Sequence, residues 1–287
     1  MTSEAAHPTA EHIPTAEHIE LFRRDGVVRL RKAFDPKWLE TLRIGVQNDI
    51  AAPSERLVRH SPSDAPAHYW EDFWVWNEIP EIGAFLRESP AARYAGRLLS
   101  ARRINLLVDN WFYREAGSPS RPPWHHDISY FDFHGSMCVL WLPLDAVRAE
   151  DAIAFVRGSH LWGKHFLRTR FSGEQAPGAA PGEVNGVLYE ETPDIDGDPS
   201  AYDILSFDLE AGDCLFFDMR SLHGALRTIV TKTDSIRFTA RFTAEDGRIA
   251  YRGDWAAPER RIFEAWGYRN GDAIDGHAFP RLWEAPI

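Results

Sequence analysis

The chain has 287 residues, of which 44% are hydrophobic, so it can bury a large core, and nothing in this composition demands more than one domain. Its 32 basic and 43 acidic residues give a formal net charge of -11, and no block of lysine and arginine could follow a phosphate backbone, so we expect no nucleic-acid partner. No window reaches the length of a membrane span and no leader pattern opens the chain, so we expect a cytoplasmic protein without a membrane partner.

The N-terminal part of the chain predicts helices. A tandem hexapeptide, PTAEHI, fills residues 8–19, and we expect residues 1–14 to be disordered. We expect Thr15 to be the N-cap of a helix and Gly26 to end that helix, and we expect residues 27–30 to form a short strand after it. The other elements expected here are two helices, at about residues 36–50 and 82–99, and a connection between them that contains Trp70, Trp74 and Trp76.

From residue 104 onward the pattern changes to short runs of β-branched and aromatic residues between turn residues. These runs predict strands near residues 104–114, 124–129, 137–144, 153–157, 204–209, 214–218, 225–230 and 237–244. About eight such strands after a helical preface predict a mainly β fold, a jelly-roll barrel packed against helices. Cys138 and Cys214 lie in two of the runs and are expected to be buried thiols. Residues 161–203 are rich in Gly, Pro and Glu, which is typical of a lid or a disordered insert.

One predicted strand carries a His-x-Asp pair, and a further histidine follows 98 residues after the first. His125 and Asp127 are two residues apart, so on a strand they point to the same face while His126 points elsewhere. His223 follows the apolar run CLFFD, and Gly224 after it allows close backbone approach. Two imidazoles and one carboxylate are a ligand set that suits Fe(II), with open positions for a chelating cosubstrate and O2.

A chain with twelve histidines shows such pairs by chance, so the surroundings carry the argument. A Pro-Pro-Trp lead-in precedes the pair, a His-Gly follows later, and arginines lie on the strand beyond it. The rival histidines have weaker settings: His134 lies in a turn, His160 ends a strand, and His165 lies in the polar insert. For these three a structural or solvated role is the better interpretation.

Several segments, taken in order, resemble the phytanoyl-CoA dioxygenase family of Fe(II)- and 2-oxoglutarate-dependent oxygenases. They are IELFRRDGVVRL, PPWHHD, VLWLPLD with its sequel AIAFVRGSH, and LEAGDCLFFDMRSLHGA, and the final GDAIDGHAFPRLW is similar to the tail of bacterial members. The resemblance covers nearly the whole chain. It implies a single cupin-like domain over residues 1–287, a double-stranded β-helix that holds iron through His125, Asp127 and His223.

The resemblance also implies how the cosubstrate binds. In such enzymes 2-oxoglutarate chelates the metal, and its far carboxylate pairs with an arginine on the strand after the distal histidine, where a planar guanidinium makes a bidentate contact. Arg237 and Arg241 share one strand face, 14 and 18 residues beyond His223. We favour Arg237, because it lies nearer to the usual, slightly shorter spacing, and Arg241 comes second.

Six further residues are candidates for the site. The resemblance puts Asn110, His126 and Trp141 near the cosubstrate, although Trp141 fits a core position and Asn110 a strand-pairing position equally well. The aromatic residues that follow the iron motif are candidates for the substrate pocket, or else fill the core beneath a turn; they are Tyr130, Phe131 and Phe133.

The implied reaction couples the oxidative decarboxylation of 2-oxoglutarate by O2 to the oxidation of an unactivated C–H bond. Asp127 argues against halogenation, because halogenases of this architecture carry a small residue in place of the carboxylate. No local cluster of basic residues fits the phosphates of coenzyme A, so we expect a monomer or homodimer that hydroxylates a small molecule of secondary metabolism. Two alternatives stay open: the same chemistry giving desaturation, epoxidation or ring closure, and a non-catalytic cupin-like metal- or ligand-binding module.

Overall fold

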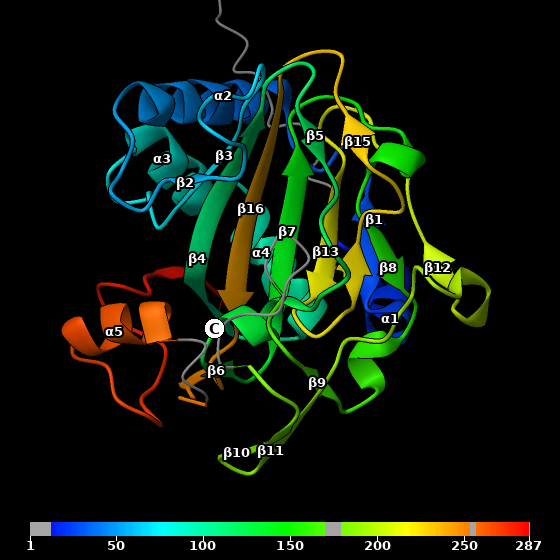
Figure 1. The fold of residues 1–287 in the computed structure, drawn as a ribbon. Helices are drawn as coiled ribbons and strands as arrows, with labels where there is room; N and C mark the ends of the chain where they lie inside the picture. Colours follow the sequence, from blue (N-terminus) through cyan, green and yellow to red (C-terminus); the bar gives the residue numbers. More distant parts are fainter. Residues whose placement is uncertain (1–12, 170–178, 253–256, 287) are drawn as a thin grey trace, which may run out of the picture.

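The computed structural model describes residues 13–169, 179–252 and 257–286, and its centre is a large antiparallel sheet with helices on one face (Figure 1). The strand order in this main sheet is β1-β13-β7-β16-β4-β3-β2, and β18 also pairs with β4. Its strands are β1 (Val27–Leu30), β2 (Val58–Arg59), β3 (Tyr69–Phe73), β4 (Arg103–Arg114), β7 (Met137–Pro143), β13 (Cys214–Asp218), β16 (Ser235–Thr243) and β18 (Arg281–Glu284).

The helices largely follow the sequence prediction. Thr15 caps α1 (Ala16–Asp25), and Gly26 ends it with a left-handed φ of 79°. Helix α2 (Pro36–Ala51) also agrees with its prediction. The helix predicted at residues 82–99 was wrong in one respect, because it is broken into α3 (Pro80–Glu88) and α4 (Ala91–Leu99). Ser89 precedes a proline and is extended, as the proline ring disfavours the helical conformation at that position.

Other predicted elements differ in detail. The tryptophan-rich connection contains a strand, β3, that the sequence pattern did not predict. The strand predicted at residues 124–129 is absent: His125 makes an isolated bridge to His223, and a 3-10 turn, η1 (Asp127–Tyr130), follows. Of the strand predicted at residues 225–230, only the end is a strand, β15 (Ile229–Val230), and a separate short strand, β14 (His223–Gly224), precedes the predicted range.

A smaller sheet, of order β12-β8-β14, packs against the main sheet and forms the second layer of a jelly roll. Phe155 of β8 (Ala154–Val156) packs against Phe217 of β13, with ring centroids 5.0 Å apart. Other elements outside the main sheet are β5 (Pro119–Ser120), β6 (Phe133–His134), η2 (Ala149–Asp151), η3 (Ser159–Leu161), β12 (Ile204–Leu205), β17 (Arg248–Ile249) and α5 (Ala257–Ala265).

The interval 161–203 holds more regular structure than its sequence predicted. Strands β9 (His165–Phe166), β10 (Gly182–Val184) and β11 (Val187–Glu190) form a small sheet, and a 3-10 turn, η4 (Pro199–Ala201), follows. Residues 170–178, like most of residues 1–14, lie outside the described residues. The role of the interval as a lid therefore stays a prediction.

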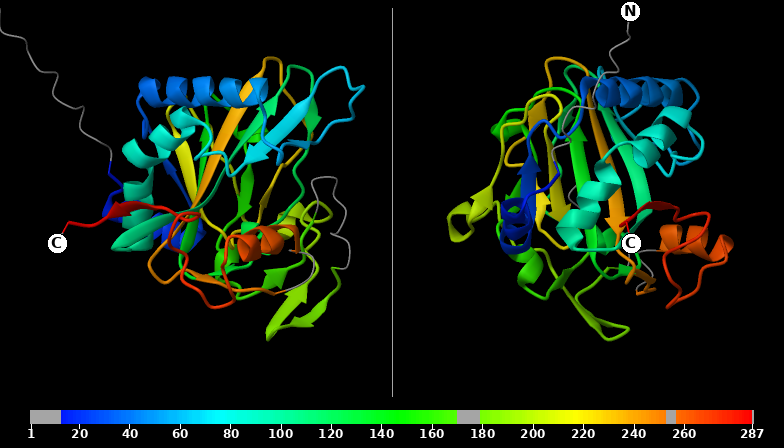
Figure 2. Two further views of the ribbon diagram at one scale, coloured as in Figure 1. Left: turned by 90° about the vertical axis from the view of Figure 1, so that its left-hand side faces the viewer. Right: turned by 180° about the vertical axis from the view of Figure 1, so that it is seen from behind.

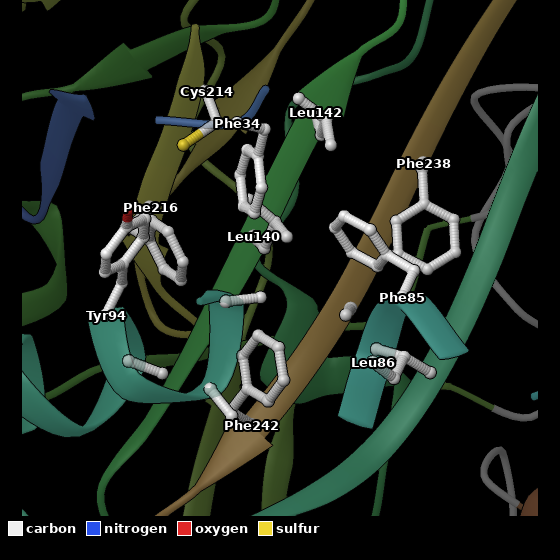
Figure 3. Close-up of a cluster of buried hydrophobic side chains, with 14 of the residues drawn as sticks. Phe34, Phe85, Leu86, Tyr94, Leu140, Leu142, Cys214, Phe216, Phe238 and Phe242 are labelled. Atoms are coloured by element: carbon white, nitrogen blue, oxygen red, sulfur yellow. The ribbon is translucent and has the colours of Figure 1, made fainter. Parts of the chain in front are cut away.

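Alternation along the central strands separates an apolar face from a polar one. On β16, Phe238 and Phe242 face the helices, whereas Arg237, Thr239 and Arg241 face the opposite side. Helices α3 and α4 lie over the main sheet when the molecule is seen from behind (Figure 2). Figure 3 shows the core between these layers, including Phe34, Phe85, Leu86, Tyr94, Leu140, Leu142, Phe216, Phe238 and Phe242.

Both cysteines belong to this core. Cys138 and Cys214 are buried free thiols, as predicted. In the described part of the chain, no helix combines the length and the apolar character that crossing a bilayer requires.

Candidate metal centre and cosubstrate cavity

Three predicted ligands lie together on the polar side of the main sheet. A pair of backbone hydrogen bonds joins His125 to His223, with N–O distances of 2.9 and 2.8 Å, and holds their ring centroids 4.2 Å apart. Oδ1 of Asp127 lies 3.6 Å from Nε2 of His125 and 3.5 Å from Nε2 of His223. One ligand atom from each side chain falls within 4.8 Å of the other two, and all three side chains are buried.

The hydrogen bonds of the two imidazoles aim their Nε2 atoms at this point. Nδ1 of His125 lies 2.7 Å from the carbonyl oxygen of Pro123, and Nδ1 of His223 lies 3.0 Å from that of Ser221. A carbonyl oxygen only accepts, so each Nδ1 carries the proton and each Nε2 presents a lone pair. This is the tautomer that a metal ligand needs.

The protonation states also suit a cation. Burial, and then the nearby His223, lower the pKa of His125 to about 3, and burial lowers the pKa of His223. Burial by itself would raise the pKa of Asp127, but the positive charge of Arg241, which also donates a hydrogen bond to this carboxylate, acts against it, and this pKa lies below its usual value. At neutral pH the three groups are two neutral imidazoles and one carboxylate, which are the forms that bind a metal.

The two arginines proposed for the cosubstrate have different surroundings. Nε of Arg241 donates to Oδ2 of Asp127 at 2.7 Å, and its Nη1 donates to Oδ1 of Asn110 at 2.7 Å. Arg237 donates from Nη1 to the carbonyl oxygen of Ile236 at 2.9 Å, and its guanidinium lies 5.7 Å from the ring centre of Trp141. In the described part of the chain, no carboxylate lies within ion-pair distance of Arg237.

Arg237 stays a cation in this setting. Burial and the neighbouring Arg114 lower its pKa to about 10, which still leaves the guanidinium protonated at neutral pH. It therefore offers a buried positive charge to a ligand in the cavity.

A cavity of about 610 Å³ connects these groups. Most of the predicted site residues line it, namely His125, Asp127, His223, Arg237, Arg241, Asn110, Trp141, Tyr130 and Phe131. Two predicted residues lie elsewhere. Nε2 of His126 accepts a hydrogen bond from the Phe166 amide at 3.0 Å, on the other side of the motif. Phe133 is fully buried, stacked on Phe131 with ring centroids 5.7 Å apart.

Sequence reasoning missed other lining residues. Glu71 and Tyr69 come from β3, which was not predicted, and Arg168 comes from the interval 161–203. The aromatic residues Tyr69, Trp70 and Phe73, which favour strands, are the signal that a strand prediction there would have used.

Comparison with known proteins relates this chain to a family. A family model described as phytanoyl-CoA dioxygenase (PhyH) matches residues 22–236. A search among curated proteins gave no match.

Solved structures with the same fold cover nearly the whole chain. SnoN, described as a non-heme α-ketoglutarate-dependent epimerase from nogalamycin biosynthesis, is 20% identical with a TM-score of 0.69, over 94% of this chain and 96% of that one. SnoK, described as a carbocyclase from the same biosynthesis, is 17% identical with a TM-score of 0.69, over 97% and 100%. EctD from S. alaskensis, solved with 2-oxoglutarate and 5-hydroxyectoine, is 14% identical with a TM-score of 0.61, over 88% and 86%. These likenesses confirm the jelly-roll fold.

Proposed function

The chain belongs to the phytanoyl-CoA dioxygenase family of Fe(II)- and 2-oxoglutarate-dependent oxygenases, and we propose that it hydroxylates an unactivated C–H bond of a small molecule of secondary metabolism. The observation that carries this proposal is the buried cluster of His125, Asp127 and His223, which opens into a cavity of about 610 Å³. A cavity of this volume suits a small-molecule ligand. Membership of an oxygenase family favours an enzyme over the alternative of a non-catalytic cupin-like binding module.

The donor set fits iron. Two imidazole nitrogens and one carboxylate oxygen converge from one side, which leaves the other side open, and this pattern is typical of non-heme Fe(II) oxygenases. With 2-oxoglutarate, iron supplies the activation of O2. The protein residues orient the cosubstrate and the substrate relative to each other and exclude water from the cavity.

We assign Arg237 to the far carboxylate of 2-oxoglutarate. Arg241 already donates to Asp127 and Asn110, whereas the guanidinium of Arg237 faces the cavity beside Trp141. A buried cation without a carboxylate partner is costly unless a ligand supplies the opposite charge. The indole of Trp141, whose ring centre is 5.7 Å from this guanidinium, lines the same cavity.

The charge of the lining favours a substrate with an acidic group. Apart from Arg237, assigned to the cosubstrate, and Arg241, paired with Asp127, the described lining residues include four arginines and two carboxylates: Arg59, Arg114, Arg121 and Arg168, against Glu71 and Asp151. This excess contrasts with the net charge of -11 of the whole chain. Contacts through Tyr130 link Arg168 to the proposed metal site, since its guanidinium is 5.1 Å from the ring centre of Tyr130, which is 5.3 Å from the ring centre of His125. Guanidinium groups bind carboxylate or phosphate best.

Succinate production tests the proposal. The purified protein is supplied with Fe(II), 2-oxoglutarate and O2 and is screened against small carboxylic acids and their methyl esters. We expect succinate formation that acids stimulate more than esters, and none in the His125→Ala variant. Equal turnover by that variant would contradict the iron site, and stimulation by esters alone would contradict the acidic substrate.

Ring closure is the second candidate outcome, and epimerisation is a third. The support is that SnoK and SnoN, with TM-scores of 0.69, are described as a carbocyclase and an epimerase. The product mass separates the three outcomes: hydroxylation adds one oxygen atom, ring closure removes two hydrogen atoms, and epimerisation leaves the mass unchanged.

A further inference from the structure

A continuous series of hydrogen bonds crosses three strands, β3, β4 and β16, and ends on the carboxylate of Asp127. It begins at His60, just after β2, whose Nε2 lies 2.7 Å from Oε2 of Glu71 on β3. Nδ2 of Asn110 on β4 donates to Oε1 of Glu71 at 2.9 Å. Arg241 on β16 then donates from Nη1 to Oδ1 of Asn110 and from Nε to Oδ2 of Asp127, both at 2.7 Å.

The donors and acceptors in this series fit in one orientation. A carboxylate only accepts, so Asn110 turns its amide NH2 to Glu71. A guanidinium only donates, so Asn110 turns its carbonyl oxygen to Arg241. The hydroxyl of Thr239 also lies against Oδ1 of Asn110, and the ring of Phe131 lies 5.3 Å from the guanidinium of Arg241. These contacts fix the plane of the guanidinium.

We propose that Glu71, Asn110 and Arg241 are positioning residues for the iron ligand Asp127, and we call these three residues the Asp127 relay. Arg241 occupies Oδ2, so Oδ1 is the oxygen that faces the two imidazoles. A carboxylate held in this way would present Oδ1 alone to the metal. It therefore leaves the positions that a chelating cosubstrate and O2 need.

The relay differs from an ordinary surface ion pair in its burial. Asp127 and Asn110 are buried, and the side chain of Arg241 is only 11% exposed. A buried carboxylate that loses its cation is left with an unpaired oxygen, which is costly. Without Arg241 the carboxylate turns to satisfy both oxygens, and the orientation toward the imidazoles is lost. The outer partners of metal ligands typically change metal affinity or activity by about 10- to 100-fold when they are removed.

Glu71 acts on Asp127 indirectly, through Asn110 and Arg241. Glu71 makes no hydrogen bond or ion pair with Asp127 or Arg241 in the described part of the chain, but it holds the NH2 of Asn110 and so directs the Asn110 carbonyl oxygen to Arg241. Loss of the acceptor at position 71 therefore frees Asn110 to turn. A glutamine at this position keeps an acceptor oxygen, so Glu71→Gln should preserve what Glu71→Ala destroys.

The inference rests on the iron site of the proposed function, and metal binding without cosubstrate tests it. Co(II) is titrated into the metal-free protein, and its visible absorption reports the ligand field. We expect Arg241→Gln to raise the Kd for Co(II) about 10-fold or more. Glu71→Ala and Asn110→Ala should raise it by about 3-fold or more, and Glu71→Gln should restore a Kd close to that of the wild type.

The matched control is Arg237→Gln, which alters an arginine on the same face of β16 that does not contact Asp127. It should leave the Kd for Co(II) unchanged. Thermal unfolding of each metal-free variant shows whether it is folded, and Arg241→Lys replaces Arg241→Gln if the latter does not fold, because lysine keeps the charge but lacks the planar fork that holds Asp127 and Asn110 in a fixed geometry.

Wild-type affinity for Co(II) in Arg241→Gln, or in Glu71→Ala, would overturn the relay. Equal losses in Glu71→Gln and Glu71→Ala would also overturn it, because the acceptor oxygen would then be irrelevant. Failure of the wild-type protein to bind Co(II) would instead contradict the iron site itself.

Discussion

Arg241 donates a hydrogen bond from Nε to Oδ2 of Asp127 at 2.7 Å, across 114 residues of sequence. This contact distinguishes the two arginines that share one face of β16. Arg241 holds the iron ligand, so Arg237 is left for the cosubstrate. The distinction leads to opposite expectations for the two variants.

Replacement of Arg237 by glutamine should weaken 2-oxoglutarate binding. Loss of one partner of a buried charge pair costs about 2 kcal/mol or more, which is a rise of about 30-fold in the Kd for 2-oxoglutarate. Calorimetry on the Co(II)-loaded protein measures this directly. Arg237→Lys should recover part of the affinity, since it keeps the charge and loses the bidentate geometry. An unchanged Kd in Arg237→Gln would show that another cation binds the cosubstrate.

Part of the arrangement of the metal and cosubstrate site could be predicted from strand periodicity. The alternation of β16 predicts that Arg237 and Arg241 share a face, and the resemblance supplies the three ligands. The distinction between the arginines could not be predicted, because it depends on contacts with Asp127 and Asn110 that only the folded sheet brings together.

The iron motif itself shows a different limit. Residues 124–129 look like a strand by composition, but only His125 pairs with His223, and the chain then turns at Asp127. The ligands converge even though the strand was wrong, because the turn brings Asp127 back toward the imidazoles. Glu71 was missed for the opposite reason, since its strand, β3, has the sequence YWEDF, in which two aromatic residues precede two acidic ones, so apolar and polar residues do not alternate along it.

Gly224 should be essential for the close approach of the two chain segments that carry His125 and His223. A Cβ at this position would lie 3.0 Å from the backbone N and Cα of Trp124, next to His125, so the two segments would have to separate. Gly224→Ala should therefore weaken Co(II) binding about 10-fold and lower the melting temperature.

The control for this change is Gly96→Ala, where a Cβ would lie 2.4 Å from the ring of Trp283, far from the iron ligands in the helix layer. It should lower the melting temperature and leave the Kd for Co(II) unchanged. Equal effects of both variants on metal affinity would mean that metal binding merely follows global stability.

His126 should make the metal-free protein less stable in acid. Burial, and then His165, lower the pKa of His126 to about 3, and its Nε2 accepts from the Phe166 amide. The unfolded chain binds a proton here below about pH 6.5, whereas the folded chain does not until about pH 3. The contribution to stability is therefore complete above pH 6.5 and falls as the pH drops, by at most about 1.4 kcal/mol per pH unit.

His126→Gln tests this, because an amide oxygen can accept the same hydrogen bond without titrating. Urea unfolding at several pH values between about 6.5 and 4.5 should give a shallower loss of the free energy of unfolding for the variant than for the wild type. Parallel losses would show that His126 is not the titrating group.

Phe238 should be a major contributor to the stability of the core. It is fully buried between β16 and the helices and packs edge-on against Phe85, with ring centroids 5.2 Å apart. Phe238→Ala should lower the free energy of unfolding by about 3–5 kcal/mol. Leu161, which is 67% exposed, is the control, and Leu161→Ala should change stability by about 0.5 kcal/mol or less. Comparable losses in the two variants would contradict the burial that we describe.

The central claim is that His125, Asp127 and His223 hold the metal on which 2-oxoglutarate binds. Anaerobic calorimetry of 2-oxoglutarate binding, with and without Fe(II), tests it most directly. We predict one molecule bound per chain with Fe(II), weak binding without it, and a comparable loss in His125→Ala and Asp127→Ala even when Fe(II) is present. Tight binding that is independent of Fe(II), or that survives in both variants, would contradict the account.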